Sequence, residues 1–440
     1  MITFPKEFRF GTATAAYQIE GAITQDGRGR NIWDDFSETP GKTYEGQTGA
    51  ITNDHYNRYK EDIAIMKELG LDSYRLSIAW SRILPDGEGR VEQRGIDFYR
   101  RLFTELINNG IRPYVTLYHW DLPSALQAKG GWNNRATVDA YVQYAKTCFE
   151  SFSDLIDVWM TFNEPFCSSF LGHAHGVHAP GHTSIQEAYT VLHHHYVAHG
   201  LTVRAFREGG YKGYIGIVLN NMTAGPATDS PEDKEACEIA RAYGARLFLD
   251  PLYKGSYPEI AIAPGVTIPI QDGDLEITST PFDFLGVNYY WEDMVQADAS
   301  TPTKYKVVQT NRDKTAMGWD IYPEGLYNQL TWIHQNYEVN YMYVTENGAA
   351  FEDVVLHDGR IHDVYRTEYI RTHLEAIAKA IKEGVPVKGY FLWSFIDNFE
   401  WSYGYTKRFG IVRCDYDTQK RTIKDSGYWY RDLIAHNKSN

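Results

Sequence analysis

Two glutamates stand out because each one follows a run of strand-forming residues and has an asparagine beside it. Glu164 comes after residues 158–162 and Asn163, and Glu346 comes after residues 341–345. Two carboxyl groups that face each other across a cleft can divide acid–base work, one being protonated and the other ionised. Hydrolysis of a glycosidic bond needs such a pair. A surface salt bridge is the common role of a glutamate, but strand-end positions favour side chains that point into a cleft.

Polar and aromatic side chains also end the other β-rich segments of the chain. A buried polar group is costly unless it has a partner, so a whole ring of them favours a ligand, although any single asparagine could equally cap a loop. The residues of this ring, besides the two glutamates, include Gln18, Glu20, Arg75, His119, Trp120, Asp121, Asn163, Asn220, Asn288, Tyr290, Trp393, Asp397, Glu400 and Trp401.

Aromatic residues make up 15% of the chain, with 33 tyrosines and 11 tryptophans. Both side chains combine a flat apolar face with a polar edge. A pyranose sugar is apolar on its faces and polar on its rim, so this composition suits a sugar ligand. An aromatic-rich core without a ligand explains the composition equally well, and composition leaves both interpretations open.

Eight β-rich segments alternate with helical segments, which predicts an α/β fold whose parallel strands close into a (β/α)8 TIM barrel. The predicted strands are residues 9–15, 73–79, 112–119, 157–163, 214–220, 283–289, 342–346 and 388–394. The predicted helices are residues 54–69, 97–108, 136–152, 185–208, 231–249, 322–336, 363–383 and 426–436. In such barrels the loops after the strands build the active face. We expect the polar stretch 297–315 to be one of these loops.

Further domains and several classes of partner are not expected. No internal repeat or linker divides the chain, which predicts one barrel domain over residues 1–440. The net charge of −14 argues against nonspecific binding to nucleic acid or to anionic membranes. No apolar run suits a signal peptide or approaches the roughly 18 residues of a membrane span.

The cysteines point to a reducing compartment. Cys148, Cys167, Cys237 and Cys414 are scattered without a CxxC pair. That spacing favours reduced thiols over a disulfide framework or a zinc site. We therefore expect a cytoplasmic protein.

The chain contains several sequence motifs whose order along the chain resembles that of a known protein family. Residues 161–165 (TFNEP) and 343–348 (YVTENG) resemble the two active-site motifs of family 1 glycoside hydrolases, the β-glucosidase family, and residues 8–21 resemble its N-terminal signature. The resemblance covers essentially the whole chain. Further matching segments are residues 74–81, 118–121, 286–290, 318–323 and 393–401.

The resemblance implies a retaining mechanism through a glycosyl-enzyme, without cofactor or metal. By motif position Glu346 is the nucleophile and Glu164 the acid/base. Glu346 must be ionised, and Arg75 and Tyr290, which match family positions, are the expected donors to it. The charge of Glu346 helps to raise the pKa of Glu164. Glycosylation removes that charge, so Glu164 can then ionise and act as the base towards water.

The resemblance also implies how a sugar is held. The positions that match glycone-binding residues of the family are Gln18, His119, Asn163, Glu400 and Trp401, while Trp393 matches the stacking floor. Trp120 and Asn288 are expected to support the site. The implied substrates are small β-glycosides such as cellobiose and aryl glucosides, which places the protein in the breakdown of cellulose and related polysaccharides. The family also accepts galactosides and fucosides, so the preferred glycone, the aglycone and the oligomeric state are not predicted.

Three other functions were weighed. A 6-phospho-β-glycosidase is disfavoured because Glu400 would repel a phosphate dianion and Phe409 stands where a phosphate-binding tyrosine is expected, although Lys407 and Arg408 lie nearby. A non-catalytic sugar-binding barrel would typically lack one of the two carboxylates. A metal hydrolase is suggested by several histidines, but they occupy a loop and consecutive helix positions, which do not converge on one open site. These histidines are His173, His175, His178, His182 and residues 193–195.

Overall fold

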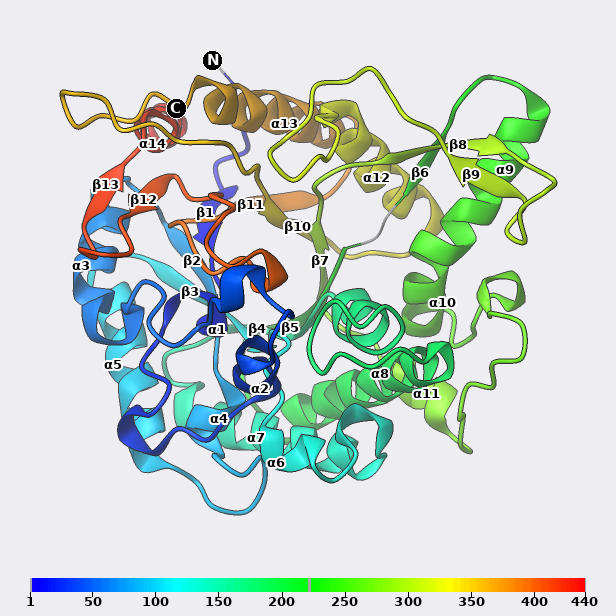
Figure 1. Ribbon diagram of the computed structural model, residues 1–440, viewed down its shortest axis with the longest axis horizontal. Coiled ribbons are helices and arrows are strands. Elements are labelled where there is room, and N and C mark those ends of the chain that lie inside the picture. Colours follow the sequence, from blue (N-terminus) through cyan, green and yellow to red (C-terminus); the bar gives the residue numbers. More distant parts are fainter. Residues whose placement is uncertain (1, 221–222, 440) are drawn as a thin grey trace.

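The computed structural model describes residues 2–220 and 223–439. Eight parallel strands close into a barrel in the order β1-β11-β10-β7-β5-β4-β3-β2, with helices arranged around them (Figure 1). This confirms the predicted (β/α)8 barrel and all eight predicted strands to within two residues at each end. The barrel strands are β1 (Arg9–Ala13), β2 (Ser73–Ser77), β3 (Arg112–Tyr118), β4 (Val158–Asn163), β5 (Tyr214–Leu219), β7 (Phe284–Asn288), β10 (Met342–Asn347) and β11 (Val387–Trp393).

The larger helices cover the outside of the barrel, so its strands are buried on both faces. Every residue of β2, β4, β7 and β10 is buried, which explains why these strands are rich in apolar and aromatic residues instead of alternating. The helices are α3 (His55–Glu68), α5 (Gln93–Asn108), α7 (Ala136–Phe152), α8 (Ile185–Glu208), α9 (Pro231–Arg241), α10 (Leu247–Tyr253), α12 (Pro323–Asn336), α13 (Val364–Lys382) and α14 (Asp425–Lys438).

Two predicted helices differ from the structure. Helix α5 begins four residues before the predicted start at residue 97, because the Glu92 side chain caps it by accepting a hydrogen bond from the backbone N–H of Arg94. The single helix predicted over residues 231–249 is divided into α9, a π-helical turn (Ala242–Arg246) and α10. Pro251 inside α10 has no N–H to donate to the carbonyl of Leu247, where the regular helix resumes.

Short elements build the loops on the active face. Five short helices are α1 (Ala16–Ile19), α2 (Ile32–Glu38), α4 (Trp80–Ile83), α6 (Ser124–Gln127) and α11 (Asp274–Thr278). Strands β6 (Ala224–Pro226), β8 (Asp293–Ala297) and β9 (Tyr305–Val307) form a separate sheet, and β12 (Val412–Cys414) pairs with β13 (Arg421–Ile423). The predicted loop over residues 297–315 lies in the connection between β7 and α12, and it contains the short strand β9. Strand β9 is antiparallel to β8 and pairs Val307 with the buried Val295. The polar composition of the segment does not predict this tertiary contact.

The two ends of the chain lie side by side (Figure 1). The Asn437 side chain in α14 accepts a hydrogen bond from the backbone N–H of Phe4 and donates one to the carbonyl of Ile2. Within residues 2–220 and 223–439, no helix is both long and apolar enough to cross a bilayer. All four cysteines are buried and unpaired, as their spacing predicts.

Candidate active site

The two glutamates meet at the carboxyl-terminal end of the barrel. Glu346 belongs to β10 and Glu164 follows the last residue of β4. The register pairs Glu346 with Asn288 at the end of β7. Because neighbouring parallel strands all end at the same rim, these side chains lie close together.

Glu346 is held by two donors on opposite oxygens. Arg75 Nη1 donates to Oε1 at 2.6 Å and the Tyr290 hydroxyl donates to Oε2 at 2.7 Å. The Arg75 side chain is 1% exposed and that of Glu346 is 5% exposed, so little water screens this ion pair. A cation and a hydroxyl both favour the charged form of a carboxyl group. The predicted pairing of Glu346 with Arg75 and Tyr290 is present in the structure.

Glu164 has a different environment. Asn288 Nδ2 donates to its Oε1 at 2.7 Å, and the Cys167 sulfur lies 3.1 Å from its Oε2. Burial, followed by the negative charge of Glu346, raises the pKa of Glu164 above its ordinary value. One carboxyl group is therefore paired with a cation, while its neighbour retains its proton to higher pH.

Asn163 links the two glutamates to His119. Its Oδ1 accepts from Arg75 Nη2 at 2.6 Å, so its Nδ2 must be the atom 3.1 Å from His119 Nε2. An amide nitrogen only donates, and His119 Nε2 therefore accepts. Burial, with the charge of Arg75, lowers the pKa of His119 well below its ordinary value. The ring is neutral with its hydrogen on Nδ1, and that N–H has no partner among the described residues.

Glu400 and Gln18 also present atoms without protein partners. Gln18 Nε2 donates to the carbonyl of Phe399 at 2.9 Å, while Gln18 Oε1 and Glu400 Oε2 accept no hydrogen bond from any described residue. Burial, together with the charges of Glu346 and Glu164, raises the pKa of Glu400 to about 8. The sequence predicts a carboxylate at Glu400, but the surroundings of this side chain in the fold favour its protonated form. The reason is the proximity of two other acids, which local sequence does not reveal.

Three residues of the site have left-handed backbone conformations. These are Trp120 (φ 76°), Glu164 (φ 45°) and Trp401 (φ 51°). A non-glycine residue in this region is strained and persists only where the surrounding structure holds it, which happens most often at functional sites. Trp120 is held through its indole N–H, which donates to the carbonyl of Asn163 at 2.8 Å.

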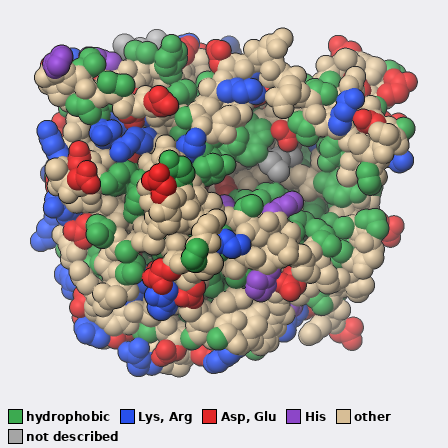
Figure 2. Space-filling view, viewed as in Figure 1, with side chains coloured by type: hydrophobic (Ala, Val, Ile, Leu, Met, Phe, Trp, Pro, Cys, Tyr) green, Lys and Arg blue, Asp and Glu red, His purple; other side chains and the backbone are tan. Residues whose placement is uncertain are grey.

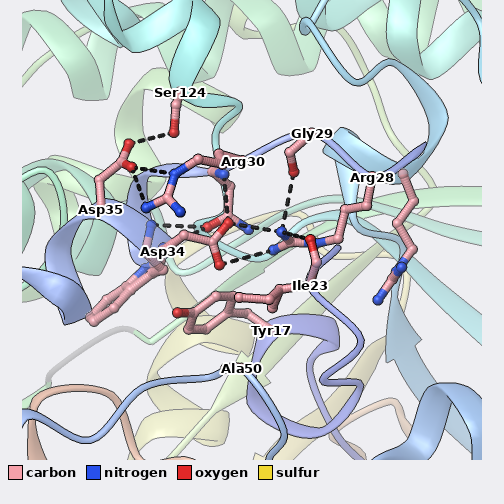
Figure 3. A network of polar contacts seen from close by, with 12 residues as sticks. Tyr17, Ile23, Arg28, Gly29, Arg30, Asp34, Asp35, Ala50 and Ser124 are labelled. Carbon is pink, nitrogen blue, oxygen red and sulfur yellow. Dashed lines mark hydrogen bonds and ion pairs between the residues drawn. The ribbon is translucent and has the colours of Figure 1, made fainter. Parts of the chain in front are cut away.

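A polar network lies around Arg28, Arg30, Asp34 and Asp35 at the start of α2 (Figure 3). Arg28 donates to Asp34 at 2.8 Å, and Asp34 forms a capping box with Asn31 at the start of α2. Helix α2 carries Trp33, whose ring centroid lies 4.5 Å from that of Trp401. The long loop after β1 thus fixes an aromatic wall at the other side of the barrel mouth.

The site residues surround a cavity of about 440 Å³. Figure 2 shows the face hollowed near its centre, with hydrophobic side chains around the hollow. Arg75, Asn163, Asn288 and Gln18 are buried, and the first three hydrogen bond to residues that line the cavity. The predicted residues that line it are His119, Trp120, Glu164, Tyr290, Glu346, Trp393, Glu400 and Trp401.

The model for glycosyl hydrolase family 1 matches residues 1–439. This chain belongs to glycosyl hydrolase family 1. Among its relatives, β-glucosidase A of Thermotoga maritima is 48% identical over 437 residues, which cover 99% of this chain and 98% of the relative. The 1,4-β-D-glucan glucohydrolase of Thermotoga neapolitana is 47% identical over 440 residues, or 99% of each chain.

Solved structures of the family agree with the fold described here. The family 1 β-glucosidase from Thermotoga maritima superposes with a TM-score of 0.97 at 48% identity, covering 99% of each chain. The same enzyme has been solved in complex with deoxynojirimycin and with glucoimidazole. The structure of the AHE enzyme from Alicyclobacillus herbarius gives a TM-score of 0.95 at 48% identity, covering 100% of this chain and 99% of that one.

Sequence reasoning did not place the outer half of the cavity of this family 1 enzyme. Trp291 and Trp319 stack there with ring centroids 4.6 Å apart. Trp319 belongs to the matching segment 318–323, whereas aromatic type was the only local signal for Trp291. The apolar residues of the long loops carry no chemical signature, so only the fold brings them to the cavity. The other lining residues are Phe166, Cys167, Leu171, Val177, His178, Asn220, Met317, Ser402, Tyr403 and Phe409.

Several histidines of the metal alternative have structural partners. His193 bonds Asp274 and Tyr257, and His173 bonds the carbonyl of Ser168. Across residues 2–220 and 223–439, no group of three or more histidine, cysteine or acidic side chains is arranged to hold a metal ion.

A larger groove of about 1150 Å³ lies between residues 2–5, α13 and α14. Its charged side chains include the exposed pair Arg371–Glu375, separated by 2.5 Å. These are solvated groups of opposite sign. The smaller cavity, where buried polar atoms converge, is the better candidate for chemistry.

Proposed function

We propose that this chain is a retaining β-glucosidase that removes terminal β-D-glucosyl residues through a covalent glycosyl-enzyme. The observation that carries the proposal is the contrast between two carboxyl groups in one cavity. Glu346 is held by a cation and a hydroxyl, whereas Glu164 is buried beside it and keeps its proton to higher pH. One enzyme thus holds a nucleophile and a general acid ready at the same pH.

In the first step Glu346 attacks the anomeric carbon. Arg75 and Tyr290 orient its two oxygens and stabilise its charge before the attack. Glu164 gives its proton to the departing glycosidic oxygen, so that the aglycone leaves as a neutral alcohol.

In the second step water attacks the glycosyl-enzyme. Glu346 is now an ester and no longer carries the charge that raised the pKa of Glu164. Glu164 therefore ionises more readily and removes a proton from the attacking water. Glu164 thus changes from acid to base because Glu346 loses its charge when the glycosyl-enzyme forms.

The glycone is proposed to bind to the atoms that lack protein partners. Gln18 Oε1 and Glu400 Oε2 would accept from sugar hydroxyls, and His119 Nδ1–H would donate to one. Asn163 is proposed to contact the hydroxyl beside the anomeric carbon, and Trp393 to stack under the ring. The indole N–H of Trp401 supplies a further donor. Each unmade hydrogen bond of a buried group costs about 1–3 kcal/mol, which a bound sugar recovers.

Small β-glucosides such as cellobiose and aryl glucosides are the proposed substrates. The stacked pair Trp291–Trp319 offers a flat surface to the leaving group. A relative from Bifidobacterium breve, 41% identical, is named a bifunctional β-D-glucosidase/β-D-fucosidase. That relationship supports some activity on fucosides as well.

Unphosphorylated sugars are proposed because basic side chains near the site are engaged elsewhere. Lys407 Nζ donates to the carbonyl of Ala316 at 2.7 Å, and Arg408 pairs with Asp397 at 2.6 Å. The cavity wall at this end is acidic through Glu400. Among the described residues that line the cavity there is thus no free cation to balance the charge of a phosphate dianion.

We further propose that the chain works as one domain in the cytoplasm. Its four free thiols support a reducing compartment. The family model extends over residues 1–439, which supports a single functional unit.

The test is covalent labelling followed by chemical rescue. A 2-fluoro-β-glucosyl inhibitor should label the peptide that contains Glu346, as shown by mass spectrometry. Glu164→Ala should lose more activity on poor leaving groups than on activated aryl glucosides, and azide should restore turnover as the β-glucosyl azide. Glu292→Gln is the matched control, because Glu292 is a buried acid that does not line the cavity. A label on another peptide would overturn the assignment of Glu346.

A further inference from the structure

Cys167 lies in a place that its sequence spacing did not suggest. It begins a π-helical turn (Cys167–Leu171), and its backbone N–H donates to the carbonyl of Glu164 at 2.9 Å. That contact brings the Cys167 sulfur to 3.1 Å from Glu164 Oε2. Cys167 is 6% exposed and lines the cavity.

The contacts of the sulfur determine its role as a donor. Burial, with the nearby charge of Glu164, raises the pKa of the Cys167 thiol well above its ordinary value, so the sulfur keeps its hydrogen. Asn220 Nδ2 lies 3.5 Å from the sulfur and can only donate to it. The sulfur accepts from Asn220 on one side and directs its own hydrogen to Glu164 on the other.

We propose that Cys167 is a positioning residue for Glu164, whose Oε2 it holds by a hydrogen bond that strengthens when the carboxyl group ionises. The proposal rests on the proposed function, in which Glu164 loses and regains a proton in each turnover. Asn288 holds Oε1 in the same way from β7. The two donors together fix the plane of the carboxyl group relative to the cavity.

A thiol suits a group that changes protonation state twice per cycle. Sulfur is a weak donor and a weak acceptor, so it can serve both the carboxylate and the carboxylic acid. An apolar side chain would leave a buried carboxylate oxygen without a donor and would disfavour the base. A much stronger donor would stabilise the carboxylate and disfavour the acid.

Other groups facing Glu164 are left unchanged by substitution at Cys167. Glu346 from β10 raises the pKa of Glu164, whereas Arg75 from β2 lowers it. The charge of Glu164 also contributes to the raised pKa values of Tyr290 and Glu400. A change in pH dependence caused by Cys167 is therefore separable from these constant contributions.

The decisive comparison is Cys167→Val against Cys167→Ser. Valine keeps an apolar volume and removes the donor, whereas serine keeps a donor. The basic limb of kcat/KM for p-nitrophenyl β-glucoside should move up by about 0.5–1 pH unit in Cys167→Val, the shift expected from one weak hydrogen bond to the charged form. In Cys167→Ser it should stay closer to that of the wild type. If Cys167 served only in packing, Cys167→Ser should harm the enzyme more than Cys167→Val.

Controls separate this proposal from the function on which it rests. Cys237→Val removes another buried thiol, which donates to the carbonyl of Ala224 at 2.9 Å outside the cavity, and should leave the pH profile unchanged. Cys167→Ala gives the same test if the valine variant does not fold. A wild type without β-glucosidase activity would refute the proposed function. An active wild type whose basic limb coincides with those of Cys167→Val and Cys167→Ala would overturn the role of Cys167 alone.

Discussion

Two regions of this protein bury several charged side chains, and they are built in opposite ways. The catalytic cavity brings together three acids, of which Glu346 pairs with Arg75. The second region, here called the ion network, lies beneath the loops after β10 and β11. It matches three acids with three cations and consists of Asp353, Asp363, Asp397, Arg366, Arg408 and Lys424.

The ion network satisfies each charge with a specific partner. Lys424 pairs with Asp353 and lies 2.8 Å from Asp397, and Arg366 lies 3.0 Å from Asp353. Burial alone would raise the pKa of Asp353, but Lys424 and Arg366 lower it overall. Each acid of the ion network therefore has at least one cation within ion-pair distance.

The cavity has the reverse balance. Glu164 and Glu400 have raised pKa values because burial and neighbouring acids outweigh the available cations. A fold that pairs its buried charges gains a rigid support, whereas one that leaves acids in excess retains protons that can be transferred near neutral pH. The second arrangement costs stability, which is consistent with its restriction to the catalytic site.

The largest effect is expected from removing the nucleophile. Glu346→Gln keeps the shape and the acceptor for Arg75 but cannot form the glycosyl-enzyme. We expect kcat for p-nitrophenyl β-glucoside to fall on the order of 10⁴-fold or more. A variant with more than a tenth of wild-type activity would contradict the role of Glu346.

The next largest effect is expected from a substitution that breaks the ion network. Lys424→Met leaves Asp353 and Asp397 without their shared cation in a fully buried position. The free energy of unfolding should fall by about 3–5 kcal/mol, measured by denaturant titration. Lys379→Met is the control: Lys379 pairs with Glu324 on the surface, and its loss should leave the free energy of unfolding almost unchanged. Equal losses in the two variants would show that burial of the network does not matter.

A smaller effect is expected from Glu400, which is proposed to bind hydroxyls at the far edge of the sugar. Glu400→Ala should reduce kcat/KM for glucosides by about 1–3 kcal/mol of transition-state stabilisation for each hydrogen bond lost. The wild type should show little turnover of the 6-phosphorylated substrate, and the variant should narrow that difference. Preference of the wild type for p-nitrophenyl β-glucoside 6-phosphate over the unphosphorylated compound would refute the proposed specificity.

The smallest expected effect is on the pH dependence of the free energy of unfolding, which the buried acid Glu164 should control. The pKa of Glu164 is higher in the folded than in the unfolded protein, so the folded state binds more protons and loses stability as pH rises above the unfolded value, near 4.5. Glu164→Gln should be about 1–2 kcal/mol more stable than the wild type at pH 8. Below pH 4 the two should unfold alike. A stability difference that is independent of pH would contradict this account.

Much of the barrel and the position of the two glutamates at its rim are predictable from local sequence. Eight β-rich segments, each with a polar end, identify the strands and place Glu164 and Glu346 at one rim, because strand propensity and parallel topology are properties of short segments. The helix bounds were less certain where a side-chain cap or a π-helical turn intervenes, as at Glu92 and residues 242–246.

The state of the site depends on contacts between residues far apart in the chain. The protonation of Glu400 depends on Glu346 and Glu164, and the role of Cys167 on its distance from one carboxyl oxygen. The ion network pairs Lys424 with Asp353, 71 residues earlier. The sequence by itself determined which elements form and which acids face the cavity, since these follow from local pattern. Only the tertiary structure decided which acids keep their protons, because burial and the distances between charges exist only once the chain has folded.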